Sequence, residues 1–183
     1  RDAHIAVLTT TSEYPRQVGE EYRTLLLELG AHSVSVLYIA NREGANDRQY
    51  LNTIAEATGI FMTGGDQLRL TSILGGSKVD AALRQAYLRG TVIAGTSAGA
   101  SVMSDTMIVE GDSSDTPKKS TLNMAHGMGL LEAVVIDQHF AQRGRINRLL
   151  AAVAQNPMVL GVGIDEDTAL VVSPDGKCEV IGS

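Results

Sequence analysis

The sequence has little cysteine, no long apolar run and no excess of positive charge, and each absence excludes a class of protein. Cys178 is the single cysteine, which excludes an internal disulfide and leaves the redox compartment undecided. No apolar run reaches the length of a transmembrane helix, so we expect no membrane partner. Acidic residues outnumber basic ones, 21 against 15, and no basic stripe is present. This charge balance argues against a nucleic-acid partner.

Internal repeats, low-complexity tracts and linkers are also missing. The 183 residues, 44% of them hydrophobic, therefore predict one soluble globular domain over residues 1–183. The chain starts with Arg1 rather than Met and shows no signal-peptide pattern there, so we expect an N-terminal segment to have been removed. We expect a cytoplasmic protein, with secretion left open if a signal segment preceded Arg1.

Apolar β-branched runs alternate with amphipathic segments along most of the chain. The predicted strands are 5–8, 33–39, 59–63, 91–94, 130–136 and 159–164, and the predicted helices are 13–29, 47–57, 68–74, 79–89 and 143–153. Residues 109–119 predict a polar loop, and residues 168–172 and 177–181 predict a closing β-hairpin. The alternation predicts an α/β fold with a mostly parallel sheet and helices on both faces.

The most specific signal lies in residues 91–104. An apolar run there meets Gly95-Thr96-Ser97-Ala98-Gly99, and small residues follow. The pattern predicts a strand–turn–helix elbow with Ser97 at its apex, because a Cβ at either glycine would strike a neighbouring element. Taken alone, tight packing of small residues explains the motif as well as catalysis does.

Three further polar clusters follow predicted strands, and parallel strands place such clusters at one edge of the sheet. They are Gly64-Gly65-Asp66-Gln67, Asp137-Gln138-His139 and Asp165-Glu166-Asp167. A serine nucleophile needs a base, for which imidazole is suited, and the resulting imidazolium needs a carboxylate. The clusters supply both. Backbone N–H groups of Ala98 and of Gly64 or Gly65 are suited to form an oxyanion hole.

Each cluster also has a simpler structural explanation. His139 can cap a helix, and the three acids can form a solvated turn. Asp66 and Gln67 can be an N-cap and a first helical residue, and the arginines at 143, 145 and 148 can form a solvated helix face. Their joint placement after strands is what favours a catalytic site.

Taken together, the motifs resemble those of the cyanophycinases, which belong to the serine peptidase family that also holds the aspartyl dipeptidase (peptidase E). The resemblance covers residues 5–172. The motifs that carry it are Gly64–Gln67, Gly95–Ala100, Asp137–Phe140 and the set Arg143, Arg145 and Arg148. It implies a flavodoxin-like α/β fold related to class I glutamine amidotransferases, with a serine where those have a cysteine.

The resemblance also implies roles for individual residues. Ser97 is the expected nucleophile, which forms an acyl-enzyme, His139 the base and Glu166 the orienting carboxylate. The expected oxyanion donors are Gly65 and Ala98. The expected substrate-binding residues are Gln67, Asp137, Gln138, Arg143, Arg145 and Arg148. No metal or cofactor is implied, and a homodimer is expected.

The implied substrate is cyanophycin, a polyaspartate backbone that carries arginine on its side-chain carboxyls. The implied exopeptidase cuts backbone peptide bonds and releases β-Asp-Arg dipeptides. Arginine forks suit carboxylates, and Asp112, Asp115 or Asp137 suit the substrate guanidinium. Full-length members of the family add an N-terminal strand with a glycine-rich loop, which we expect this chain to lack.

Two alternatives remain open. The first is an aspartyl dipeptidase acting on short Asp-X peptides, which the arginines after His139 disfavour. The second is a binding module that has kept the fold without the chemistry, which the intact Ser, His and Glu set disfavours. A lipase-like esterase is disfavoured because no apolar lid or acyl-pocket stretch accompanies the elbow.

Overall fold

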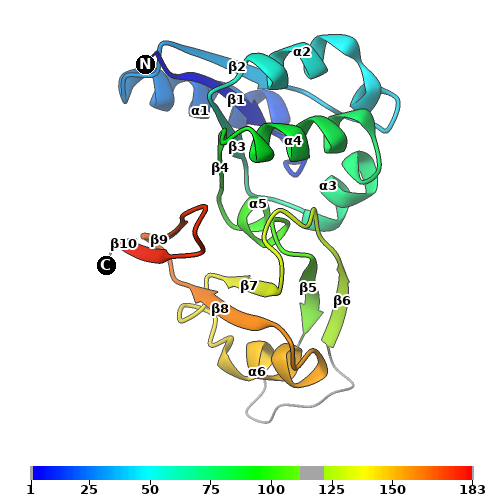
Figure 1. Cartoon of the computed structure of the whole chain (residues 1–183), viewed down its shortest axis with the longest axis vertical. Helices are drawn as coiled ribbons and strands as arrows, with labels where there is room; N and C mark the ends of the chain where they lie inside the picture. Colours follow the sequence, from blue (N-terminus) through cyan, green and yellow to red (C-terminus); the bar gives the residue numbers. More distant parts are fainter. Residues whose placement is uncertain (1, 112–121, 183) are drawn as a thin grey trace.

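The computed structural model of the protein describes residues 2–111 and 122–182, and its first half alternates strands with helices (Figure 1). The elements are β1 (His4–Leu8), α1 (Pro15–Glu28), β2 (Ser33–Leu37), the 3-10 turn η1 (Gly44–Asn46), α2 (Arg48–Glu56), β3 (Gly59–Met62), α3 (Gln67–Leu74), α4 (Lys78–Leu88) and β4 (Val92–Gly95). The four strands form one parallel sheet in the order β2-β1-β3-β4. This part of the chain agrees closely with the predicted elements.

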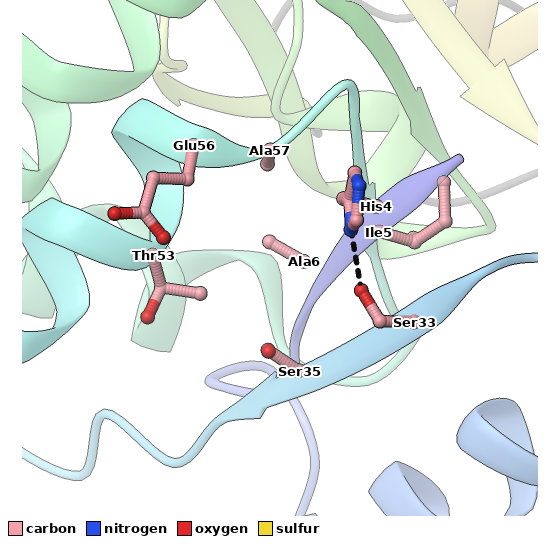
Figure 2. A pocket seen from close by; sticks show the side chains of 8 residues that line it. All are labelled: His4, Ile5, Ala6, Ser33, Ser35, Thr53, Glu56 and Ala57. Atoms are coloured by element: carbon pink, nitrogen blue, oxygen red, sulfur yellow. Dashed lines mark hydrogen bonds between the residues drawn. The ribbon is translucent and has the colours of Figure 1, made fainter. Parts of the chain in front are cut away.

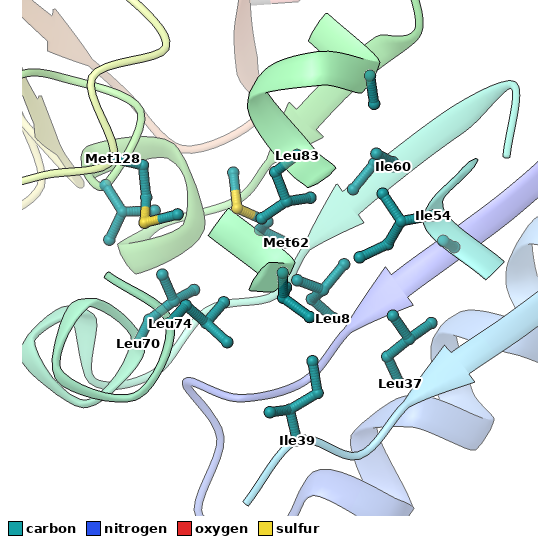
Figure 3. Packing of buried hydrophobic residues seen from close by; sticks show 14 of the residues in the cluster. Leu8, Leu37, Ile39, Ile54, Ile60, Met62, Leu70, Leu74, Leu83 and Met128 are labelled. Atoms are coloured by element: carbon teal, nitrogen blue, oxygen red, sulfur yellow. The ribbon is translucent and has the colours of Figure 1, made fainter. Parts of the chain in front are cut away.

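Helices cover both faces of this sheet because its strands are apolar on both sides. On one face, the ring of Tyr22 in α1 packs on Phe61 of β3 with centroids 4.8 Å apart. The residues flanking Phe61, Ile60 and Met62, point to the other face, as the period of two requires. There they join the main hydrophobic core with residues of α2, α3 and α4 (Figure 3). Fully burying a side chain of this size contributes roughly 1.5–3 kcal/mol.

The turn that joins β3 to α3 starts the helix with a side-chain cap. The carboxylate of Asp66 accepts hydrogen bonds from the backbone N–H of Leu68 at 2.8 Å and of Arg69 at 3.1 Å. Such a cap satisfies N–H groups that have no partner inside the helix. The structural explanation of Asp66 as an N-cap is therefore correct, and the cap fixes where the Gly64-Gly65 segment ends.

The second half of the chain contains shorter elements. They are α5 (Ala98–Ser101), β5 (Thr106–Gly111), β6 (Leu122–His126), β7 (Val134–Gln138), α6 (Ile146–Gln155), β8 (Leu160–Ile164), β9 (Thr168–Val172) and β10 (Cys178–Gly182). β5 and β6 are antiparallel, β7 and β8 are parallel, and β9 and β10 form the predicted hairpin. α6 packs on β5 and β7 through Leu149 and Ala152. In Figure 1 this half lies below the four-stranded sheet, with α5 at the junction.

Some details differ from the sequence-based expectations. β6 was not predicted, and β7 begins at Val134, four residues after the expected start at 130. The predicted polar loop at 109–119 is wrong at its start, because β5 continues to Gly111. A register shift between Ile108 and Glu110 interrupts the alternation that would have marked this strand. β7 pairs with β8 and not with the four-stranded sheet. α6 begins three residues later than expected, after Gly144 at a φ of 58°.

Candidate active site

Ser97 stands at a strained turn between β4 and α5. Its backbone angles, φ of 51° and ψ of −115°, lie in a region that residues other than glycine rarely adopt. A Cβ at Gly95 would overlap the carbonyl of Gly99, and a Cβ at Gly99 would overlap the carbonyl of Met62. The two glycines therefore permit the close approach of strand and helix that the sequence predicted, and they hold Ser97 at the end of β4.

The side chain of Ser97 begins a chain of two hydrogen bonds. Its Oγ lies 3.1 Å from Nε2 of His139, and Nδ1 of the same ring lies 2.8 Å from Oε1 of Glu166. A carboxylate only accepts, so Nδ1 carries the proton and Nε2 is left to accept from the serine hydroxyl. This is the arrangement in which an imidazole can take the proton of a serine.

His139 and Glu166 come from the ends of neighbouring strands. β7 and β8 pair up to Gln138 and Ile164; His139 follows Gln138 directly, and Glu166 lies two residues after Ile164. His139 has a φ of 49°, so its loop turns sharply away from the strand. The side chains of His139 and Glu166 are 27% and 53% exposed, which leaves the pair open to solvent. Of the three acids considered, Glu166 is the one whose carboxylate meets His139.

The oxyanion donors predicted from the sequence are the backbone N–H groups of Ala98 and Gly65. Ala98 is the first residue of α5, so its N–H has no preceding turn of helix to donate to. α5 is only four residues long, and the prediction therefore depends on this N–H rather than on a helix dipole. Gly64 approaches the serine closely, because a Cβ built on it would lie 3.3 Å from that of Ser97. Gly65 follows with a φ of 136°.

Thr11 fixes the peptide between the two glycines. Its buried hydroxyl lies 2.7 Å from the carbonyl oxygen of Gly64, and its own carbonyl accepts the N–H of Asp66 at 2.9 Å. The peptide is trans, so its N–H, which belongs to Gly65, points away from Thr11. Thr11 was not predicted as a site residue, although it follows β1 and so lies at the same edge of the sheet as Ser97.

Gln67, an expected substrate-binding residue, is engaged within the protein. The side chain is buried, and its Nε2 donates to the backbone carbonyl of Ile108 in β5. It thereby joins the start of α3 to β5. The role predicted for Gln67 in substrate binding remains a prediction.

Asp137, Arg145 and Arg148, also expected at the substrate, form a buried ionic cluster. Asp137 is 1% exposed and each arginine 8%. Arg148 contacts both carboxylate oxygens, through Nε at 2.9 Å and through Nη2, and Arg145 reaches the same carboxylate at 3.3 Å. Burial first, and then the charge of Arg148, lower the pKa of Arg145. One carboxylate faces two guanidinium groups, so the cluster carries an excess positive charge.

The remaining expected substrate residues surround this cluster. Oε1 of Gln138 is buried and lacks a hydrogen-bond partner within the described ranges, while the Gln138 backbone carbonyl accepts from Arg145. Arg143 is exposed, and its charge also lowers the pKa of Arg145. Asp112 and Asp115, the other acids suggested for the substrate guanidinium, lie outside the described residues.

A separate pocket of about 250 Å³ lies at the amino ends of β1 and β2, beside the end of α2 (Figure 2). His4 Nδ1 lies 2.7 Å from Ser33 Oγ there. Figure 2 shows Glu56 across the pocket from His4, with no hydrogen bond between them. Without a carboxylate on the imidazole or a turn that presents the serine, this pair does not reproduce the arrangement at Ser97.

The described residues hold no group of three or more His, Cys, Asp or Glu side chains that could bind a metal ion. Among the helices within 2–111 and 122–182, none has the length and apolar character needed to cross a membrane.

Comparison with known proteins places this chain in a family. The sequence model of peptidase family S51 matches residues 6–180. A cyanophycinase of Geminocystis herdmanii is 42% identical over 182 residues, which are 99% of this chain and 67% of the relative. A cyanophycinase of Trichormus variabilis is 42% identical over 98% of this chain and 61% of the relative. The chain therefore spans 61–67% of the length of these two relatives.

Two solved structures share the fold. A peptidase from an acI-B1 Actinobacterium superposes with a TM-score of 0.75 at 23% identity, covering 99% of this chain and 74% of that one. A candidate peptidase E from Listeria monocytogenes EGD-e gives a TM-score of 0.70 at 18% identity, covering 99% and 86%. The predicted α/β fold with a parallel sheet and flanking helices is thereby confirmed.

Proposed function

The chain belongs to peptidase family S51, and on that premise we propose that it is a serine-type exopeptidase that hydrolyses cyanophycin to β-Asp-Arg dipeptides. The observation that carries the proposal is the hydrogen-bond chain from Ser97 through His139 to Glu166. The two relatives described above are cyanophycinases, which supports cyanophycin as the substrate.

In the proposed reaction Ser97 Oγ attacks the carbonyl carbon of a backbone peptide bond, and His139 Nε2 takes the hydroxyl proton. Glu166 stabilises the imidazolium through Nδ1–H. The N–H groups of Ala98 and Gly65 are proposed to bind the oxyanion. The imidazolium then protonates the leaving amine, which breaks the peptide bond and leaves an acyl-enzyme on Ser97. Water, deprotonated by His139, releases the acid product and restores the serine.

The arginines support an acidic substrate. Arg143 is exposed beside a buried cluster that already carries excess positive charge, so a carboxylate of the substrate is favoured there. Both oxygens of Asp137 accept hydrogen bonds from guanidinium groups of the protein. Asp137 is therefore poorly suited to bind the guanidinium of the substrate as well, and we propose that it positions the arginines.

Replacing Ser97 by Ala tests the mechanism directly. We expect hydrolysis of cyanophycin to be lost, because the nucleophile is removed, while the thermal unfolding curve stays unchanged. Ser72→Ala, which alters an exposed serine on α3, is the matched control and is expected to keep full activity. Release of β-Asp-Arg is the measurement. Continued turnover by the Ser97→Ala variant would contradict the proposed nucleophile.

The two alternatives are separated by substrate and by labelling. Parallel assays of cyanophycin and of Asp-Leu distinguish the polymer enzyme from an aspartyl dipeptidase, and preference for Asp-Leu would reject our substrate. Labelling of Ser97 by a serine-directed phosphonate would exclude the non-catalytic binding module.

We also propose that the protein acts as a homodimer. Large apolar side chains remain exposed on α6 and at the start of β8, where a second copy can cover them. They are Ile146, Leu150, Met158 and Leu160. Size-exclusion chromatography with light scattering measures the mass, and a monomer at micromolar concentration would contradict this part of the proposal.

A further inference from the structure

The loops that carry His139 and Glu166 exchange side-chain contacts beyond the end of the strands. Oε1 of Gln142 accepts the backbone N–H of Glu166 at 3.2 Å, and Oδ1 of Asp165 accepts the backbone N–H of Ala141 at 2.8 Å. Each loop thus supplies one oxygen that satisfies a backbone donor of the other loop. We call Gln142 and Asp165 the loop latch.

The loop latch continues the pairing of two parallel strands. The register of β7 and β8 ends at Gln138 and Ile164, and one further backbone bond, from Phe140 N–H to the Ile164 carbonyl at 3.2 Å, follows it. A Cβ at Gly163 would overlap the ring of Phe140, so this ring lies directly on β8. The latch bonds lie past this point, at residues 141–142 of one loop and 165–166 of the other.

The His139–Glu166 contact needs such support. The glutamate side chain is 53% exposed, and an exposed ion pair of long side chains holds one geometry only weakly. His139 itself lies at a positive φ, which the surrounding structure has to maintain. A bond from Gln142 to the N–H of Glu166 fixes the backbone from which the carboxylate extends. A bond from Asp165 to the N–H of Ala141 does the same for the histidine loop.

We propose that Gln142 and Asp165 are positioning residues that hold Glu166 against Nδ1 of His139. The proposal depends on the proposed function, because the pair matters only if His139 acts as the base. Neither residue touches the reacting atoms. Their loss is expected to lower kcat and to leave KM unchanged, because the substrate still binds while the imidazole is held in the wrong orientation.

The test compares five variants of the whole chain, four single and one double, with the unaltered protein. Gln142→Leu and Asp165→Ala each remove one acceptor oxygen. Asp165→Asn keeps an amide oxygen that can accept the same N–H, so it should rescue the function. Gln17→Leu is the matched control. It also removes one hydrogen bond of an exposed glutamine, the bond of 3.0 Å from Gln17 Nε2 to Glu21 Oε1 on α1.

We expect kcat for cyanophycin to fall about tenfold in Gln142→Leu and Asp165→Ala, with KM within about twofold of the starting value. Asp165→Asn and Gln17→Leu are expected to stay within about twofold in both constants. The Gln142→Leu/Asp165→Ala double variant should lose less than the product of the single losses, because both act on one contact. Unchanged kcat in the single variants, or a loss confined to KM, would overturn the proposal.

Crystal structures of the two acceptor-less variants provide a readout that needs no substrate. We expect the Nδ1–Oε1 separation to open from 2.8 Å to beyond about 3.5 Å, which is past hydrogen-bond distance. A pair that remains at its present distance would overturn the latch even if activity fell. If the unaltered protein does not hydrolyse cyanophycin, the proposed function fails, and the structures still decide the latch.

Discussion

Replacing Asp137 by Asn is expected to destabilise the protein by about 3–5 kcal/mol, the usual cost of removing one partner of a buried ion pair. Asparagine has nearly the same shape, so the packing is kept and only the charge is removed. Arg145 and Arg148, each 8% exposed, are then left buried without the carboxylate that both contact. For a domain of 150–250 residues, this loss of unfolding free energy corresponds to a fall in Tm of about 6–20 °C.

Replacing Arg145 by Met should have a much smaller effect. The buried cluster then changes from an excess of one positive charge to neutrality, and Arg148 still contacts both oxygens of Asp137. A lowered pKa means that the folded state disfavours the charged form of Arg145. That penalty is fully present at pH 7 and disappears only as pH rises through the pKa of the folded state. The substitution removes the penalty and loses the hydrogen bonds from Arg145 to Asp137 and to the Gln138 carbonyl, so we expect a net cost of about 1 kcal/mol.

Urea denaturation at pH 7 measures both variants on one scale. The order of the two losses in unfolding free energy is a sharper test of the role of Asp137 than either value alone. If Asp137→Asn costs less than about 1 kcal/mol, or if Arg145→Met costs more than Asp137→Asn, the carboxylate is not what makes burial of the two arginines tolerable.

Three further changes test the surroundings of Ser97. Thr11→Val removes the hydroxyl that lies against the Gly64 carbonyl and is expected to lower kcat about tenfold. Thr11→Ser keeps the hydroxyl and is the control. Unchanged kcat in Thr11→Val would show that the Gly64–Gly65 peptide needs no such contact. Gly99→Ala places a methyl group against the Met62 carbonyl, so we expect the free energy of unfolding to fall by more than about 2 kcal/mol. Thermal unfolding measures this, and an unchanged unfolding temperature would contradict the geometry of the elbow. Gln67→Met leaves a buried β5 carbonyl without its donor and should cost about 1–3 kcal/mol in urea denaturation; an equally stable variant would mean that the bond contributes little.

The first half of the fold could be predicted because its signals are local and regular. Phe61 and its neighbours alternate between two apolar faces, and Asp66 caps α3 as its residue type suggests. β5 was missed because its register shift at Val109 breaks the alternation, and the polar residues that follow made the region resemble a loop. The separation of β7 from the four-stranded sheet depends on pairing between distant segments, which periodicity does not encode.

The sequence was enough to predict which residues of the candidate site contact one another. The rule that parallel strands present their carboxyl ends at one edge accounts for His139 and the acidic cluster, which follow β7 and β8. The choice of Glu166 came from the family resemblance. Ser97 follows β4 in a different sheet, and the structure nevertheless has the three side chains in contact. The directions of long side chains were not predictable. Gln67 turns inward to β5, and Arg145 and Arg148 turn onto Asp137. Gln142 was not singled out, because its partner lies 24 residues away on another loop.

The positive φ of Ser97 and of His139 means that this protein is less stable than its own fold allows. Each such residue costs on the order of 1–3 kcal/mol, and glycine at either position would relieve the strain while removing the hydrogen bonds that join Ser97, His139 and Glu166. A chain selected for stability alone would carry glycine at both positions. The two side chains required for the proposed chemistry are instead kept where the backbone tolerates them least. Selection for activity and selection for stability therefore oppose each other at the same two residues.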